Sequence, residues 1–153
     1  MIRPIETVKP EIRVLGLDTC REGEVFGAVV RGGMYLDGVI HFYVDGNRSR
    51  QLGKYVVATK YYPELRALML HDPENHLVTG TLEQVTMLPV ISIFEGRRVG
   101  RGYSIFHSLH GTILQKSNLP SSIVDKILLV TWTYGAVPEP ARLAHQLARN
   151  SAL

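Results

Sequence analysis

Residues 11–33 read EIRVLGLDTCREGEVFGAVVRGG, and this stretch predicts how the sheet of the fold begins. The apolar run IRVLGL ends at Asp18, which is typical of a buried strand that stops at the edge of a sheet. Two further apolar runs, residues 25–31 and 34–44, are separated by two glycines that can supply the positive φ of a tight reversal. We therefore expect a three-strand antiparallel meander in the first third of the chain.

Beyond the meander, the pattern predicts helices that alternate with strands. Four helices are expected, over residues 49–61, 81–87, 103–114 and 141–148. The grounds are apolar residues that recur at the spacing of one helix face, or prolines that suit a first helical turn. Short apolar runs indicate three more strands: residues 65–70, 88–94 and 127–133. Because right-handed crossovers make the later strands parallel to the first, we expect an α/β fold, with a mixed sheet of six strands and helices on both faces.

Length and composition indicate one globular domain. The chain has 153 residues, of which 45% are apolar and 20% charged, and this suits a single α/β domain over residues 11–153 behind an irregular arm over residues 1–10. The single cysteine, Cys20, excludes an internal disulfide and a cysteine-rich zinc site, and it has no base partner that the sequence predicts. Neither a signal peptide nor a run of about 20 apolar residues is present, so we expect a cytoplasmic location.

Positive charge is concentrated in two expected loops. The chain has 17 Lys and Arg against 14 Asp and Glu, and this net charge of +3 permits contact with nucleic acid without arguing for it. Candidate nucleic-acid-binding residues in residues 47–50 and 97–101 are Arg48, Arg50, Arg97, Arg98 and Arg101. The alternative is loop charge that only keeps the protein soluble, which is the commoner situation on protein surfaces.

Acidic residues follow most of the expected strands that run in the same direction. They are Asp18 after the first strand, Asp45 after the third, Asp72 beside His71 after the fourth, Glu95 after the fifth and Glu139 after the last. Open α/β sheets place their ligand crevices at the carboxyl ends of such strands. Carboxylates gathered there would repel one another unless a cation joined them, so a divalent metal site is one hypothesis. Solvated acids at ordinary strand ends are the alternative.

Several segments resemble one known family. They are KPEIRVLGLD, RGGMYLDGV, the apolar run ahead of His71, LPVI and the tail PEPARLAH, which together cover residues 9–148. The chain resembles the endonuclease V-like family formerly called domain of unknown function ninety-nine, whose members have been assigned as deoxyuridine endonucleases. The resemblance implies a ribonuclease H-like fold with a five-stranded mixed sheet, in which the three-strand antiparallel meander is joined by parallel strands and the fourth strand lies beside the first.

The resemblance also implies a function. It predicts a metal-dependent endonuclease that acts on nucleic acid containing deaminated bases, with DNA favoured over RNA and a role in DNA repair. Magnesium or manganese would activate a water and offset the charge that develops on the phosphodiester. Asp18 matches the first acid of the family, Glu139 matches its tail motif, and Asp72 is the acid beside His71 after the fourth strand. The candidate catalytic residues are therefore Asp18, Asp72 and Glu139. The candidate metal ligands are Asp18, Asp72 and His71.

Two departures from the family pattern favour a second interpretation. The family shows two consecutive acids after the first strand, where this chain has Asp18 and Thr19, and it shows Asp-Gly after the fourth strand, where this chain has His71 and Asp72. An imidazole at position 71 should weaken magnesium binding, whereas manganese or zinc would tolerate it better. The alternative is therefore a catalytically weakened or inactive homologue that binds nucleic acid or a protein partner.

The tail motif PEPARLAH adds two candidates. Arg142 lies three residues after Glu139 on the same helix face, so it is expected to hold either a phosphate or the Glu139 carboxylate itself. His145 lies three residues further on, and we place both Arg142 and His145 among the nucleic-acid-binding residues. Plain helix capping with a solvent-exposed Arg and His is the alternative. The oligomeric state is left open, with a dimer as one option.

Overall fold

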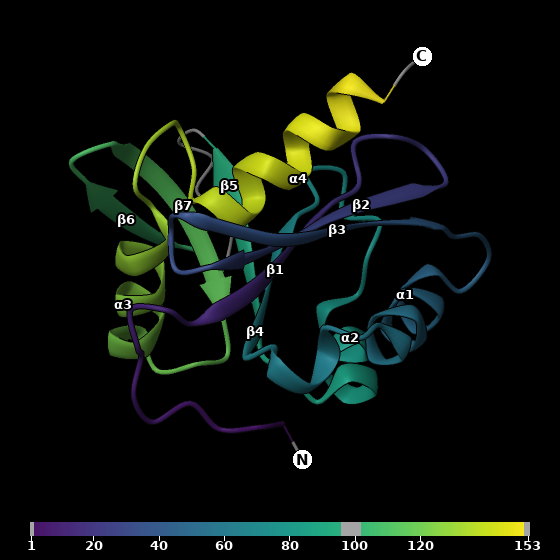
Figure 1. The fold of residues 1–153 in the computed structure, drawn as a ribbon, viewed down its shortest axis with the longest axis horizontal. Helices are drawn as coiled ribbons and strands as arrows, with labels where there is room; N and C mark the ends of the chain where they lie inside the picture. The colour runs from purple at the N-terminus through teal and green to yellow at the C-terminus, as the bar shows by residue number, and fades with distance from the viewer. Residues whose placement is uncertain (1, 96–101, 152–153) are drawn as a thin grey trace.

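The computed structural model describes residues 2–95 and 102–151 of the chain and contains one mixed sheet, shown in Figure 1. Within these ranges the sheet has seven strands in the order β3-β2-β1-β4-β5-β7-β6. The strands are β1 (Arg13–Asp18), β2 (Glu24–Arg31), β3 (Tyr35–Tyr43), β4 (Ala67–His71), β5 (Val90–Glu95), β6 (Ser104–Ser108) and β7 (Gly111–Ser117). The helices are α1 (Arg48–Ala58), α2 (Thr79–Thr86), α3 (Ser121–Thr131) and α4 (Glu139–Asn150), with a short 3-10 turn at Tyr62–Glu64.

The expected meander at the start of the chain is confirmed. Strand β1 pairs antiparallel with β2, and β2 pairs antiparallel with β3. The reversal between β2 and β3 uses Gly32 at a φ of +62°, a left-handed conformation that favours glycine. Ahead of the meander, residues 2–12 contain no helix or strand, although Ile5 in the expected arm is buried in the core.

The parallel centre of the sheet follows the meander. Strand β4 lies beside β1 and parallel to it, and β5 lies parallel to β4. In this register Asp18, the last residue of β1, is the partner of His71, the last residue of β4. The expected mixed α/β architecture is therefore confirmed. The expected numbers of strands, six from the sequence pattern and five from the resemblance, are both wrong, because the sheet has seven in the described part of the chain.

Residues 103–114 do not form the expected helix. They contain β6 and the first part of β7, which make an antiparallel hairpin that pairs with β5. Ile105 and Leu109 are 58% and 102% exposed, while Ile113 and Leu114 of β7 are buried. The helical period was a coincidence of spacing across a turn, which Gly111 closes at a φ of +145°.

Residues 127–133 were expected to form a strand, and this prediction is also wrong. Residues 127–131 are the second half of α3, and Trp132 is its C-cap. The buried residues of α3 recur at helical spacing from Ile123 to Thr131, whereas Leu129 within the apolar run is 64% exposed. A short run such as ILLVT suits a buried strand or a helix face equally well, so only packing against the sheet decides between them.

Because side chains alternate along a strand, successive residues of β1 face two different helical layers. Leu15 and Leu17 face a core shared with α1 and α2, which lie side by side in Figure 1. Val14 faces the opposite core, which α3 and the start of α4 cover. By the same alternation Asp18 points toward the α3 and α4 side. None of the helices in the described ranges combines the length and the apolar character that a membrane span requires.

Helix α4 packs very closely on β1 at Gly16. A Cβ atom at position 16 would lie 1.9 Å from the carbonyl oxygen of Pro140 and 2.9 Å from the Cα of Pro140. Further along α4, Ala144 is buried in a cluster with Ala28 and Val30 of β2. Small residues on both sides therefore let α4 lie across β1 and β2, as Figure 1 shows in yellow.

We expect the substitution Gly16→Ala to destabilise the protein by about 1–3 kcal/mol or more, because the new methyl group overlaps backbone atoms that cannot rotate away. Urea unfolding followed by circular dichroism measures this change. The matched control is Gly80→Ala in α2, where no described atom lies within 4 Å of the added Cβ, and there stability should stay equal or rise by up to about 1 kcal/mol. Equal unfolding midpoints for the two variants would contradict the close contact.

Candidate functional site

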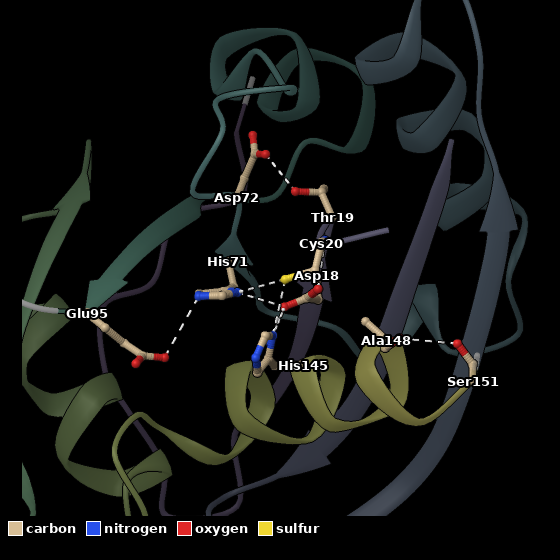
Figure 2. A network of polar contacts seen from close by, with 9 residues as sticks. All are labelled: Asp18, Thr19, Cys20, His71, Asp72, Glu95, His145, Ala148 and Ser151. Carbon is tan, nitrogen blue, oxygen red and sulfur yellow. Dashed lines mark hydrogen bonds and ion pairs between the residues drawn. The ribbon is translucent and has the colours of Figure 1, made fainter. Parts of the chain in front are cut away.

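Asp18 is a buried carboxylate that two histidines hold (Figure 2). Its Oδ2 lies 2.7 Å from Nδ1 of His71 and 2.9 Å from Nδ1 of His145. Its Oδ1 accepts a hydrogen bond of 2.9 Å from the backbone N–H of Cys20. Because an ionised carboxylate can only accept, the Nδ1 atom of each histidine carries the proton in this arrangement.

Three separate elements bring these groups together. Asp18 and His71 end two neighbouring parallel strands and are partners in register, so their side chains leave the sheet on the same face. His145 comes from α4, and the close approach of Pro140 to Gly16 sets the height of that helix above β1. The carboxyl ends of β1 and β4 therefore meet a histidine that is distant in sequence.

Cys20 completes a cluster that the sequence did not reveal. Its Sγ lies 3.2 Å from Nδ1 of His145 and 4.0 Å from Nδ1 of His71. Asp18, Cys20, His71 and His145 each offer one possible metal-ligand atom, and these atoms all lie within 4.8 Å of one another. We call this group the four-residue cluster. Its only signals in the sequence were that Cys20 follows Asp18 by two residues and that His145 belongs to the tail motif.

The Asp18 carboxylate and the His71 imidazole each stabilise the charged form of the other. Burial raises the pKa of Asp18, but hydrogen bonds from His71, Cys20 and His145 outweigh burial and lower it below its usual value. Burial lowers the pKa of His71, but the hydrogen bond and charge of Asp18, with the charge of Glu95, raise it above its usual value. The Asp18 carboxylate is therefore stabilised as an anion next to an imidazole that readily becomes a cation.

The surroundings of Cys20, in contrast, stabilise its neutral thiol. Burial of the sulfur, together with the hydrogen bond and negative charge of Asp18, raises the pKa of Cys20 to about 12. Burial of the sulfur is the largest of these causes, and the neighbouring carboxylate adds to it. Without a cation in the cluster, Cys20 is thus a neutral thiol at neutral pH and a poor nucleophile.

The cluster forms one wall of a cavity of about 550 Å³, which we call the site cavity. Residues that line it include Cys20, His71, Phe94, Glu95, Tyr103 and His145. The ring of Phe94 meets that of Tyr103 edge to face at 4.6 Å, and the ammonium group of Lys116 lies 5.5 Å from the centre of the Tyr103 ring. A carboxylate oxygen of Glu95 lies 3.9 Å from Nε2 of His71. The cavity thus combines aromatic surface with titratable groups.

Asp72, an expected catalytic residue and metal ligand, lies next to the cluster but faces away from it. Its Oδ1 accepts hydrogen bonds from the Thr19 hydroxyl at 2.6 Å and the His76 backbone N–H at 3.0 Å. Its Oδ2 accepts one from the Leu77 backbone N–H at 2.8 Å. The structure does not bring Asp72 into the four-residue cluster. Asp72 instead connects the loop after β1 to the loop after β4.

Glu139, the third expected catalytic residue, forms a bidentate ion pair with Arg142. The two bonds are 2.6 Å and 2.8 Å long, and the pair raises the pKa of the Arg142 guanidinium. The guanidinium also lies 4.5 Å from the centre of the Tyr134 ring. Of the two partners expected for Arg142, a phosphate or the Glu139 carboxylate, the structure contains the carboxylate. Glu139 does not belong to the four-residue cluster.

The remaining candidates lie apart from the cluster or outside the described residues. Arg50 is exposed and Arg48 half-buried at the start of α1. Arg97, Arg98 and Arg101 lie outside the described residues. Contact of these arginines with nucleic acid stays a prediction, as do the catalytic roles of Asp72 and Glu139.

We expect Asp72→Ala to destabilise the protein by about 2–4 kcal/mol, because three hydrogen bonds to a buried carboxylate are lost together. Chemical unfolding measures the loss. The control Asp125→Ala changes an exposed position of α3 and should shift stability by no more than about 0.5 kcal/mol. A similar small effect for both variants would show that Asp72 does not hold the two loops.

Comparison with known proteins finds relatives without a described activity. The chain is 26% identical to a UPF0215 protein of Methanosarcina mazei, over 95% of this chain and 93% of the relative. It is 29% identical to a UPF0215 protein of Methanopyrus kandleri, over 94% of this chain and 93% of the relative. No protein-family model matches the chain.

Comparison of structures finds solved proteins with a similar fold. A protein of unknown function from Archaeoglobus fulgidus superposes with a TM-score of 0.71 at 20% identity, over 90% of this chain and 96% of that chain. Endonuclease V of Bacillus subtilis superposes with a TM-score of 0.63 at 14% identity, over 97% of this chain and 84% of that enzyme. Argonaute of Marinitoga piezophila gives a TM-score of 0.64 at 9% identity, with 93% of this chain matched to 30% of that protein.

These likenesses concern the fold. They support an endonuclease V-like fold, because the superposition on endonuclease V covers 97% of this chain. The resemblance to the domain of unknown function ninety-nine in particular stays a prediction.

Proposed function

We propose that this chain is a nuclease-like protein with a ribonuclease H-like fold that hydrolyses a phosphodiester bond of nucleic acid in the site cavity. The observation that carries the proposal is the buried Asp18 carboxylate at the carboxyl end of β1, held by two imidazoles that line the cavity. Carboxyl ends of neighbouring parallel strands are where open α/β sheets bind ligands. The fold shared with endonuclease V, and with part of an Argonaute whose structure contains guide RNA and target DNA, supports nucleic acid as the substrate class.

The aromatic wall of the site cavity suits a nucleobase. Phe94 and Tyr103 meet edge to face, and aromatic side chains stack on bases of any sequence. Lys116 beside Tyr103 can contact a phosphate. Enzymes that recognise an altered base often take it out of the stack and into a pocket of this kind, which supports deaminated bases as the target. We extend the proposal to such bases, in DNA in preference to RNA.

The histidines supply the groups that exchange protons. Because Nδ1 of His145 donates to Asp18, Nε2 is the nitrogen of this ring that can accept a proton from a water or return one to a leaving oxygen. Asp18 then orients the imidazole and stabilises its protonated form, as an acid does behind a catalytic histidine. The Glu95 carboxylate lies 3.9 Å from Nε2 of His71, and its charge favours the protonated form of that ring.

Magnesium, the ion expected from the resemblance, does not fit the four-residue cluster. Magnesium prefers oxygen ligands in a near-octahedral arrangement. The cluster offers one carboxylate, two imidazole nitrogens and one sulfur. The Asp72 and Glu139 carboxylates, which could have supplied further oxygens, are bonded to other partners. We therefore assign no step of the reaction to magnesium.

The second candidate function is binding of nucleic acid without cleavage. Asp72 and Glu139 are bonded to other groups, so Asp18 is the one expected catalytic residue that belongs to the four-residue cluster. This favours binding without cleavage. Salt-dependent binding of oligonucleotides without any incision would distinguish this function from hydrolysis.

The first test is incision of labelled single- and double-stranded oligonucleotides that contain inosine or uracil, beside unmodified ones, with magnesium, manganese, cobalt or zinc. We expect cutting near the altered base, and Asp18→Asn should reduce the rate by about 10²–10⁴-fold, because the charge that organises both histidines is lost. Asp45→Asn, an exposed control, should leave the rate unchanged. Oligonucleotide binding without incision under any of these metals would support the second candidate instead.

A second test addresses the aromatic wall. Tyr103→Ala should weaken oligonucleotide binding by about 1–3 kcal/mol, because one stacking surface is lost. Fluorescence anisotropy with a short labelled strand measures the affinity. Tyr35→Ala removes an exposed tyrosine from β3 and should have no such effect. Equal affinities for the two variants would argue against base binding in the site cavity.

A further inference from the structure

We propose that Asp18, Cys20, His71 and His145 bind one zinc-type transition-metal ion, with one ligand atom from each residue. The site is distinct in its chemistry from the magnesium site that the resemblance implies. The inference concerns metal binding alone and does not depend on the proposed hydrolysis, because four protein ligands fill a tetrahedral site.

The first argument is the number and spacing of the ligand atoms. Zinc in proteins is held by four atoms in a tetrahedron, with bonds of about 2.0–2.1 Å to nitrogen and about 2.3 Å to sulfur, so neighbouring ligand atoms lie about 3.3–3.6 Å apart. In the cluster, Oδ2 of Asp18 lies 2.7 Å and 2.9 Å from the two imidazole nitrogens. The Cys20 sulfur lies 3.2 Å and 4.0 Å from the same two nitrogens. All four ligand atoms lie within 4.8 Å of one another, so shifts of roughly 1 Å would admit the ion.

The second argument is the chemistry of the donor set. Imidazole and thiolate select zinc and similar transition metals, whereas magnesium and manganese favour carboxylate, carbonyl and water oxygens. The Asp18 carboxylate and the Cys20 thiolate would together balance the two positive charges of the ion. The ion would replace the protons that the histidines now share with Asp18, and it would convert the neutral thiol into a ligand, as metal binding does when it releases protons.

The third argument is that the groups around the ligands already hold them in place. Metal-bound histidines and carboxylates are commonly oriented by a hydrogen bond from their other atom. Asp18 uses Oδ1 for the backbone N–H of Cys20, which leaves Oδ2 to face the histidines. The Nε2 atom of His71 faces the Glu95 carboxylate at 3.9 Å, an ion-pair distance that is longer than a hydrogen bond. The hydrogen bond from the Thr19 hydroxyl to Asp72 fixes the backbone between two of the ligands, Asp18 at the end of β1 and Cys20 in the loop after it.

The fourth argument is access. Cys20, His71 and His145 line the site cavity, so an ion can reach three of its four ligands from the solvent side while Asp18 closes the site from below. Figure 2 shows the three side chains converging on Asp18 from the loop after β1, the end of β4 and the helix α4. The alternative is a network of hydrogen bonds that binds no metal and in which the Cys20 thiol has no role. An experiment has to exclude this alternative.

The experiment is metal titration of the folded chain after treatment with a chelator. Calorimetry and elemental analysis should give one zinc ion per chain, and an excess of magnesium should not displace it. Cobalt in the same site should show the intense visible bands of a tetrahedral ion and a thiolate-to-cobalt charge-transfer band. Because Cys20 is the single cysteine of the chain, that band reports on one side chain only.

Two variants and one control make the result specific. Cys20→Ser should abolish the charge-transfer band and weaken zinc binding at least about tenfold, and His145→Ala should weaken it at least as much. His107→Ala changes a histidine of β6 outside the cluster and should bind one zinc ion as the unaltered chain does. Circular dichroism establishes that each variant is folded, and Cys20→Ser alone suffices if His145→Ala does not fold.

The outcomes separate this inference from the proposed function. Failure of the unaltered chain to bind zinc stoichiometrically would overturn the inference, as would unchanged zinc affinity in Cys20→Ser or displacement by magnesium. Zinc binding by a chain that cuts no oligonucleotide would leave the site standing and reject hydrolysis. Magnesium-dependent cutting that Cys20→Ser does not alter, without zinc binding, would leave hydrolysis standing and reject the site.

Discussion

The close packing of α4 on β1 at Gly16 is the contact on which the candidate site depends. A side chain at position 16 would overlap the backbone of Pro140, so only glycine lets the start of the helix come this near the sheet. This approach carries His145 to the end of β1, where its imidazole reaches Asp18. With the helix farther from the sheet, the buried carboxylate would keep only His71 as an imidazole partner. The fold and the site thus share one steric requirement.

The second constraint is the cost of burying the Asp18 carboxylate. An isolated buried charge is strongly unfavourable, and it is tolerated when it is paired and hydrogen-bonded. Here His71, His145 and the backbone N–H of Cys20 satisfy it. The same convergence places a thiol and two imidazoles around one oxygen, which is the arrangement of donors that a transition-metal ion requires. The need to neutralise one charge therefore accounts for both the hydrogen-bonded cluster and its capacity to bind a metal.

Where the sequence misled, the residues concerned were short apolar segments without a decisive period. Residues 103–114 have helical spacing, yet they pair with β5 as a hairpin whose outer face leaves Ile105 exposed. Residues 127–131 have the composition of a strand, yet they pack as the second half of α3 on the sheet. In both places pairing or packing with distant strands chose between two local conformations that the chain allows.

By itself the sequence determined the meander, the parallel strands after it and the polar ends of those strands. These follow from alternation, turn residues and the handedness of crossovers, all of which act over short stretches of chain. It thereby also determined that Asp18 and His71 end on the same edge. Only the tertiary structure decided which other groups join them. Cys20 and His145 reach Asp18, while Asp72 turns to Thr19 and Glu139 to Arg142, because side-chain direction depends on contacts between segments far apart in the sequence.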